Sequence, residues 1–157
     1  MDNKTPFYSM TPDRVIDAVE SQGWLSDFRI LELNSYENRV YQVGIDQSDP
    51  LITKFYRPNR WSDAQIQEEH DFCFELADAD ISVVAPLKNS EGDSLLIFDQ
   101  FRFTLFPRRG GRAPELDDPE HLYQLGVALG KIHAVGAAKS FVERPALDVH
   151  SYGWQSR

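Results

Sequence analysis

Residues 51–79 read LITKFYRPNRWSDAQIQEEHDFCFELADA, and this stretch decides the fold. Its first part, Leu51–Tyr56, is rich in β-branched and aromatic residues and predicts a strand with Lys54 near its centre. Ser62 then begins a helix, because its hydroxyl and the amide of Gln65 have the capping-box spacing that satisfies free backbone donors. A strand followed by a long helix therefore forms the centre of the predicted architecture.

A capped N-terminal helix and several further strands surround this centre. The helix begins at Thr11 and Pro12, residues that are favoured at an N-cap and at the first helical position. The further strands are expected over residues 29–33, 40–45, 83–87, 95–98 and 101–106. Short connections between the strands before the long helix predict an antiparallel meander. This order predicts an α+β fold, in which a helix is inserted after the third strand of an antiparallel sheet.

The segment RRGGRAP at residues 108–114 divides the chain into two parts. Its glycines, proline and arginines are typical of a linker. After it, residues 118–138 predict a long helix. The apolar positions of this helix recur at helical spacing and are Leu122, Leu125, Leu129 and Ile132. We therefore expect an N-terminal lobe over residues 1–107, and a linker with the start of a second lobe over residues 108–157.

The composition excludes several classes of protein. The 157 residues carry a formal net charge of −9, which disfavours nucleic acids and anionic membranes because phosphate attracts Lys and Arg. A single cysteine, Cys73, excludes an internal disulfide framework. The longest apolar runs reach about four residues, whereas a membrane-spanning helix needs about 20. Since the start of the chain has no secretory signal, we expect a cytoplasmic protein without nucleic-acid or membrane partners.

Lys54 and Glu69 form the most informative pair of charged residues. At roughly 100° per residue, Glu69 falls within the apolar arc of the predicted helix, which includes Ile66 and Leu76. Because burying an unpaired charge is costly, this carboxylate needs a cation or a hydrogen-bond donor, which Lys54 can provide. The pair is either an ordinary ion pair or part of a nucleotide site, in which the lysine holds phosphates and the glutamate holds the lysine. Spacing alone leaves both interpretations open.

Two other segments carry groups that a nucleotide uses. The loop NSYENR at residues 34–39 offers hydroxyl, amide and backbone N–H groups to phosphate oxygens, although the same composition suits a polar hairpin. The strand FRFTLFP at residues 101–107 runs into the linker, and it either offers free backbone groups to adenine or is an ordinary core strand. The usual glycine-rich phosphate motifs do not occur in the sequence.

The sequence predicts no metal site in this chain. Its four histidines lack the spacing of a metal-binding pair. Asp78 and Asp80 are better explained by a solvated helix end than by a metal-binding motif. Cys73 falls on the apolar stripe of the long helix and is expected to be an inert core thiol.

Four strings in the chain resemble a known protein family. The similarity to the bacterial stress response kinase A family lies in LNSYENRVYQV, ITKFYRPNRWSDAQIQEEHDF, FPRRGGR and LGKIHAVG. That family has the aminoglycoside phosphotransferase and choline kinase fold, and the match extends from about Leu31 to Pro145. The resemblance implies a protein-kinase-like small lobe that binds nucleotide, followed by a hinge and the first helix of the large lobe.

The resemblance also implies roles for particular residues in ATP binding. Ser35 matches a residue of the ATP site, Lys54 matches the strand-three lysine, and Glu69 matches the helix glutamate that pairs with the lysine. The hinge that borders adenine matches Leu105, Phe106 and Pro107.

The catalytic loop HGDxHxxN and the metal-binding DxDD of that family do not occur in this chain. We therefore assign it no catalytic residue and no metal ligand, and we expect the Mg²⁺ ligands in a C-terminal lobe that it lacks. The implied parent is an ATP- and Mg²⁺-dependent Ser/Thr protein kinase of the bacterial stress response, which phosphorylates hydroxyl groups of proteins. The chain alone is expected to bind ATP weakly and to be inactive, because phosphoryl transfer needs a base and a metal ion.

Two alternatives remain open from the sequence. The first is a small-molecule kinase that phosphorylates an aminoglycoside, choline or homoserine, since one fold serves both substrate classes. The second is a non-catalytic binding module, which the missing catalytic loop favours. The codons that follow Arg157 in the gene distinguish a truncated kinase from a module.

The predicted helix over residues 118–138 generates a prediction about association. Its apolar stripe is expected to pack on the rest of the large lobe in an intact, monomeric kinase, and contiguous apolar patches rarely stay exposed. The chain alone is therefore expected to self-associate, so that its apparent mass in light scattering rises above that of one chain as concentration increases. A strict monomer at high concentration, with this helix detached and solvated, contradicts the expectation.

Overall fold

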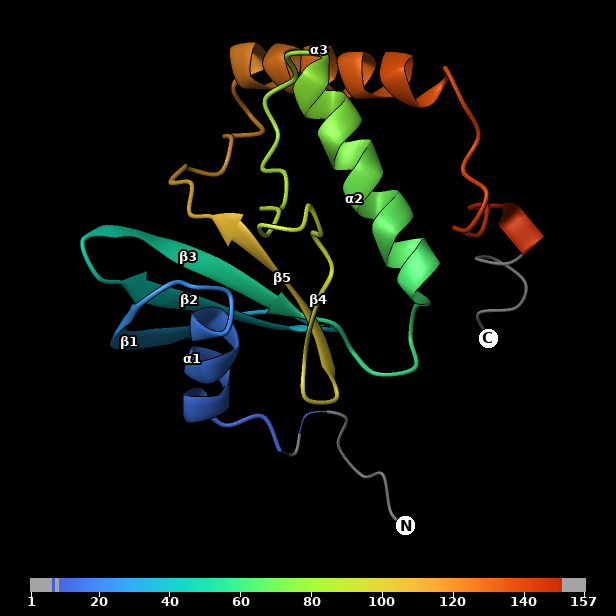
Figure 1. The fold of residues 1–157 in the computed structure, drawn as a ribbon. Helices are drawn as coiled ribbons and strands as arrows, with labels where there is room; N and C mark the ends of the chain where they lie inside the picture. The colour runs from blue at the N-terminus through green and yellow to red at the C-terminus, as the bar shows by residue number, and fades with distance from the viewer. Residues whose placement is uncertain (1–6, 8, 151–157) are drawn as a thin grey trace.

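The computed structural model describes residue 7 and residues 9–150 (Figure 1). In the described residues, one five-stranded antiparallel sheet has the order β1-β2-β3-β5-β4. The strands are β1 (Ser26–Leu33), β2 (Arg39–Ile45), β3 (Ser48–Phe55), β4 (Leu96–Phe98) and β5 (Phe101–Pro107). The helices are α1 (Pro12–Glu20), α2 (Asp63–Asp78) and α3 (Pro119–Gly136). Because α2 follows β3 in the chain, the predicted α+β fold with an inserted helix is confirmed.

The first two helices begin where their capping residues predict. Thr11 precedes α1, and its hydroxyl accepts a hydrogen bond from the backbone N–H of Arg14 (3.4 Å). Ser62 and Gln65 form the predicted capping box of α2, with hydrogen bonds of 3.1 and 3.0 Å. Loss of such a cap costs about 1 kcal/mol of stability, so the local sequence sets the start of α2 and hence the position of Glu69.

The predicted strand over residues 83–87 is wrong. This segment has no regular secondary structure, and its backbone hydrogen bond to the sheet runs from the Leu87 N–H to the Leu105 carbonyl (2.7 Å). Pro86 has no N–H to donate to a ladder, and β4 already pairs with the first residues of β5. The segment therefore runs beside β5 as an irregular connection.

The two faces of the sheet differ in character. On β3, Leu51, Thr53 and Phe55 are buried, whereas Ile52 and Lys54 alternate with them and are half-buried. The core on the buried face comprises Phe7, Val15, Ala18, Val19, Tyr41, Val43, Ile45, Leu51, Phe55, Leu96, Phe101, Phe103 and Leu105. Because α1 contributes to this core and α2 lies on the opposite side of the sheet (Figure 1), Lys54 faces α2.

The predicted helix after the linker is confirmed as α3, which lies across the end of α2 (Figure 1). It buries no residue completely. Leu122 is 50% exposed and Leu129 is 53% exposed, while Leu125 and Ile132 are half-buried. The apolar stripe of α3 is therefore only partly covered within the described part of the chain.

Two buried threonines on neighbouring strands generate a test of the packing. The Thr53 hydroxyl has no hydrogen-bond partner in the described residues, whereas Thr104 Oγ1 donates to the Ser94 carbonyl (2.8 Å). We predict that Thr53→Val raises the free energy of unfolding by about 1 kcal/mol, because it removes an unpaired polar atom. Thr104→Val is expected to lower it by about 1 kcal/mol, because it takes a donor from a buried carbonyl. Denaturant unfolding measures the contrast, and equal changes in the two variants contradict it.

Candidate functional site

Lys54 of β3 and Glu69 of α2 meet on the α2 side of the sheet. Nζ of Lys54 lies 3.1 Å from Oε1 of Glu69, and the two side chains are 22% and 33% exposed. The same Nζ lies 4.8 Å from the centre of the Tyr56 ring, which is a cation–π distance. The predicted contact is confirmed, and it leaves an oriented cation that an anion from solvent can still reach.

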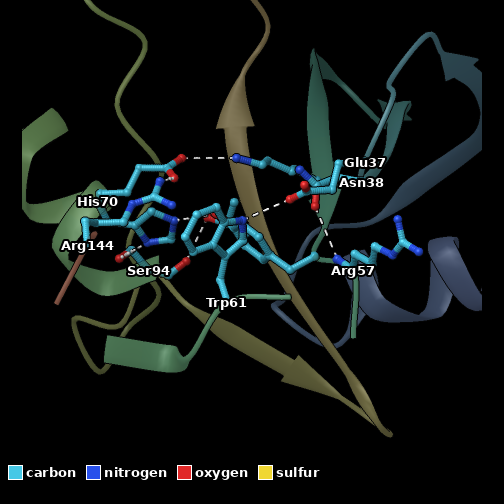
Figure 2. A network of polar contacts seen from close by, with 11 residues as sticks. Glu37, Asn38, Arg57, Trp61, His70, Ser94 and Arg144 are labelled. Carbon is cyan, nitrogen blue, oxygen red and sulfur yellow. Dashed lines mark hydrogen bonds and ion pairs between the residues drawn. The ribbon is translucent and has the colours of Figure 1, made fainter. Parts of the chain in front are cut away.

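Arg144 is a second cation at Glu69, and sequence reasoning missed it. Its guanidinium group contacts Oε2 of Glu69, so the two oxygens of this carboxylate have different partners. The guanidinium carbon also lies 4.4 Å from the centre of the Trp61 ring (Figure 2). Arg144 lies in the aperiodic segment after α3, and no spacing or motif in that segment points to α2.

The loop between β1 and β2 is braced by side-chain hydrogen bonds. Glu37 accepts hydrogen bonds from Trp61 Nε1 and from Arg60 Nε, both at 2.9 Å. The Asn38 side chain accepts one from the backbone N–H of Arg57 at 3.2 Å (Figure 2). Burial acts to raise the pKa of Glu37, but the hydrogen bonds from Arg60 and Trp61 hold it below its ordinary value. The NSYENR loop and residues 57–61 therefore hold each other in place.

Ser35, the predicted ATP-site residue of this loop, is exposed. In the described part of the chain its hydroxyl forms no hydrogen bond. Tyr36 beside it is also exposed, whereas Glu37 and Asn38 hold the second half of the loop. The first half of the loop is thus open to a ligand while the second half is fixed.

The three residues predicted to form the hinge all lie in β5, but their side chains differ in direction. Leu105 belongs to the core on the α1 side, and its carbonyl is already bonded to the connection before β4. Phe106 pairs with Ile52 of β3 and is half-buried on the face that carries Lys54. Pro107 ends the strand. Of the three predicted hinge residues, Phe106 is therefore the one whose side chain lies on the Lys54 face.

A buried polar group follows directly on Glu69 in α2. His70 is 1% exposed, and its Nε2 lies 2.7 Å from the Tyr56 hydroxyl. Its Nδ1 lies 2.9 Å from the Ser94 hydroxyl (Figure 2). Burial lowers the pKa of His70 to about 4, so the ring is neutral at pH 7. Both ring nitrogens are bonded, and the side chain fastens α2 to the end of β3 and to the segment before β4.

The other candidate residues of the sequence have ordinary surroundings. Over the described residues, no three or more His, Cys, Asp and Glu side chains form a group that could hold a metal ion. Cys73 is half-buried, and burial raises the pKa of its thiol, which makes it less reactive. Asp78 is the last residue of α2, and Asp80 lies just beyond that helix end, as predicted.

A sequence profile described as the phosphotransferase enzyme family matches residues 29–153. The chain belongs to this family. Among curated relatives of this family member, the serine/threonine protein kinase RdoA of Salmonella typhimurium is 38% identical over 156 residues, which are 99% of this chain and 47% of the relative. Stress response kinase A of Escherichia coli strain K12 is 38% identical over 146 residues, which are 93% of this chain and 44% of the relative. The resemblance to stress response kinase A is confirmed, and the chain spans about half the length of these relatives.

Solved structures of kinases share the fold of this chain. An amicoumacin kinase in complex with AMP-PNP, Ca²⁺ and Ami matches with a TM-score of 0.66 and 24% identity, over 88% of this chain and 45% of its own. A microcompartment-associated aminopropanol kinase matches with a TM-score of 0.67 and 18% identity, over 88% of this chain and 46% of its own. These matches show the fold alone, and they confirm the predicted kinase-like small lobe. Within the part of the chain that the structure describes, every helix is too short or too polar to span a membrane.

The buried histidine generates a prediction about pH. Folding lowers the pKa of His70 from its ordinary value of 6.5 to about 4, so between these values the unfolded chain binds more protons than the folded one. Stability is therefore lost as the pH falls from about 6.5 to about 4, by on the order of 2–3 kcal/mol from this residue. Urea unfolding of the chain at a series of pH values measures this loss.

Carboxylates also titrate in that range, so the test compares variants. We expect His70→Gln to flatten the dependence of the free energy of unfolding on pH between 4 and 6.5. The control, His133→Gln, changes an exposed histidine of α3 and is expected to keep the wild-type slope. A slope that is equally steep in all three proteins contradicts the assignment to His70.

Proposed function

We propose that this phosphotransferase chain is the ATP-binding part of a Ser/Thr protein kinase that acts in the bacterial stress response. The observation that carries the proposal is the 3.1 Å ion pair of Lys54 and Glu69 between β3 and α2. In kinases, a strand-three lysine held by a helix glutamate binds the α and β phosphates of ATP. The names of the relatives, a serine/threonine protein kinase and stress response kinases, support protein hydroxyl groups as acceptors.

The proposed orientation of ATP follows from three positions along the sheet. Lys54 contacts the α and β phosphates, while Ser35 and the neighbouring backbone N–H groups line the phosphate side. Of the predicted hinge, Phe106 borders adenine, and Leu105 and Pro107 flank it in β5. In support, the Ser35 hydroxyl is exposed, and Phe106 lies on the same face of the sheet as Lys54.

The proposed nucleotide-binding lobe ends at Pro107. In support, β5 ends there, α3 begins at Pro119, and the residues between them form neither helix nor strand. Because the metal-binding DxDD string of the family does not occur in the sequence, we assign no Mg²⁺ ligand to this chain and derive no metal-dependent step for it. Mg²⁺ and the catalytic base are proposed to be held by a C-terminal lobe outside this chain, in an enzyme of the cytoplasm.

A small-molecule kinase is the second candidate function. The observation in its favour is that the solved structures of similar fold are named as an amicoumacin kinase and an aminopropanol kinase. Their names refer to small molecules rather than to proteins, and one fold can serve both substrate classes. The acceptor is therefore decided by experiment and not by the fold.

ATP binding by the chain is the first test. Lys54→Ala removes the positioned cation and is expected to weaken ATP binding by about tenfold. The matched control, Lys88→Ala, removes an exposed lysine that lies over the Phe74 ring and is expected to leave ATP affinity unchanged. Titration with a fluorescent ATP analogue, with and without Mg²⁺, measures affinity. Equal affinities in wild type and Lys54→Ala reject the site.

Transfer of phosphate is the second test. The full-length gene product is incubated with ATP labelled at the γ-phosphate and with a general protein acceptor, an aminoglycoside, choline or homoserine. Label on Ser or Thr of the protein acceptor, lost in Lys54→Ala, is the expected result. Label that appears only in a small molecule establishes the second candidate instead. Robust transfer by the 157-residue chain alone contradicts the proposal that the catalytic base lies outside it.

A further inference from the structure

A segment after α3 lies along α2 and is bonded to it at both ends. This segment, residues 139–144, is called the α2 strap below. At one end, the Lys139 ammonium group contacts the Glu75 carboxylate. At the other end, the Glu143 carbonyl accepts a hydrogen bond from Gln65 Nε2 (2.9 Å). The strap therefore follows α2 from its last turns back to its first turn.

Glu68 anchors the backbone of the α2 strap. Its carboxylate accepts hydrogen bonds from the backbone N–H groups of Val142, Glu143 and Arg144, at 2.5, 3.1 and 2.7 Å. Burial acts to raise the pKa of Glu68, but these backbone hydrogen bonds hold it below its ordinary value. Because Glu69 holds the guanidinium group of Arg144, two adjacent glutamates of α2 fix the backbone and the side chain of one arginine.

The Arg144 side chain also connects α2 to the loop between β1 and β2. Its guanidinium group stacks on Trp61, whose Nε1 donates to Glu37 of that loop (Figure 2). Successive contacts therefore link five residues in the order Glu37, Trp61, Arg144, Glu69 and Lys54. The two ends of this series are the loop and the lysine that the proposed function assigns to the phosphates.

We infer that Arg144 is a positioning residue of the nucleotide site, which orients Glu69 toward Lys54 and couples this pair through Trp61 to the β1–β2 loop. The inference rests on the proposed function of that loop and of Lys54 in ATP binding. Arg144 does not compete with Lys54, because each contacts a different oxygen of Glu69. Both cations therefore hold Glu69 at the same time, and Arg144 fixes the side of the carboxylate that Lys54 leaves free.

The test uses the 157-residue chain and three variants. Arg144→Gln removes the charge at Glu69, and Arg144→Lys keeps a cation there. The control, Lys139→Gln, breaks the other ion pair of the α2 strap without touching Glu69. Two quantities are measured, namely the affinity for a fluorescent ATP analogue and the amide hydrogen exchange of residues 34–39 in the nucleotide-free chain.

Arg144→Gln is expected to weaken ATP binding about fivefold. It is also expected to speed amide exchange in residues 34–39 about fivefold, a size typical of coupling between residues in direct contact. Arg144→Lys is expected to restore part of the affinity, while Lys139→Gln stays within about twofold of wild type in both measurements. A purely structural role for Arg144 predicts the same changes in Arg144→Gln and Lys139→Gln, and that result overturns the inference. Unchanged loop exchange in Arg144→Gln overturns it as well.

A second variant, Trp61→Phe, tests the same coupling in case Arg144→Gln does not fold. Trp61→Phe keeps a smaller aromatic ring at this position and removes the N–H that bonds to Glu37. It is expected to speed exchange in the loop while the far-ultraviolet circular dichroism stays that of wild type. Unchanged exchange in this variant rejects the coupling.

The two proposals fail in different ways. If the wild-type chain binds no ATP, the proposed function fails, while the exchange comparison in the nucleotide-free chain still decides whether Arg144 couples α2 to the loop. If Lys54→Ala weakens ATP binding, but Arg144→Gln has the same ATP affinity and loop exchange as Lys139→Gln, only the positioning role of Arg144 fails.

Discussion

The half-buried carboxylate of Glu69 is the charge on which the rest of the site depends. A carboxylate turned toward a sheet is unfavourable unless cations or donors replace its water. Here Lys54 of β3 and Arg144 of the segment after α3 supply the cations, one at each oxygen. One side chain therefore joins the sheet, the inserted helix and the α2 strap. Because the two cations contact different oxygens of one carboxylate, Glu69 links Lys54 to a residue that lies 75 positions after Glu69 in the chain.

The two faces of the sheet carry different groups: the apolar core lies on the α1 face, and the charged residues of the candidate site lie on the α2 face. On the α1 face, aromatic rings such as Phe55 and Phe103 stack with 5.3 Å between their centres, and the packing is apolar. On the α2 face, α2 completely buries only Ile66, His70 and Leu76 of its described side chains. Because His70 is neutral and bonded at both ring nitrogens, it fastens α2 without placing another charge beside Glu69. The helix is thus held by buried apolar side chains and by the directional hydrogen bonds of His70.

The distribution of charge also matters more than its sum. The chain as a whole has a formal net charge of −9, yet two cations surround one carboxylate at the proposed phosphate position. The acidic composition disfavoured polyanionic partners on average, but it carried no information about where these two cations lie in the folded chain.

Local sequence determined where the helices begin, and it pointed to the Lys54–Glu69 pair of the site. Thr11, Ser62 and Gln65 act on backbone groups within one helical turn, so their capping roles and the start of α2 were readable from spacing. Periodicity placed Glu69 toward the sheet, and burial energetics then required a cation there. Tertiary structure decided the rest, because its contacts leave no periodic pattern in the sequence. The strand expected over residues 83–87 did not form, since β4 already pairs with that part of β5. The hydrogen-bond partners of Trp61 and Arg144 lie 24 and 75 residues away from them in the chain. Such contacts depend on where the folded chain brings segments together, and neither spacing nor propensity encodes that.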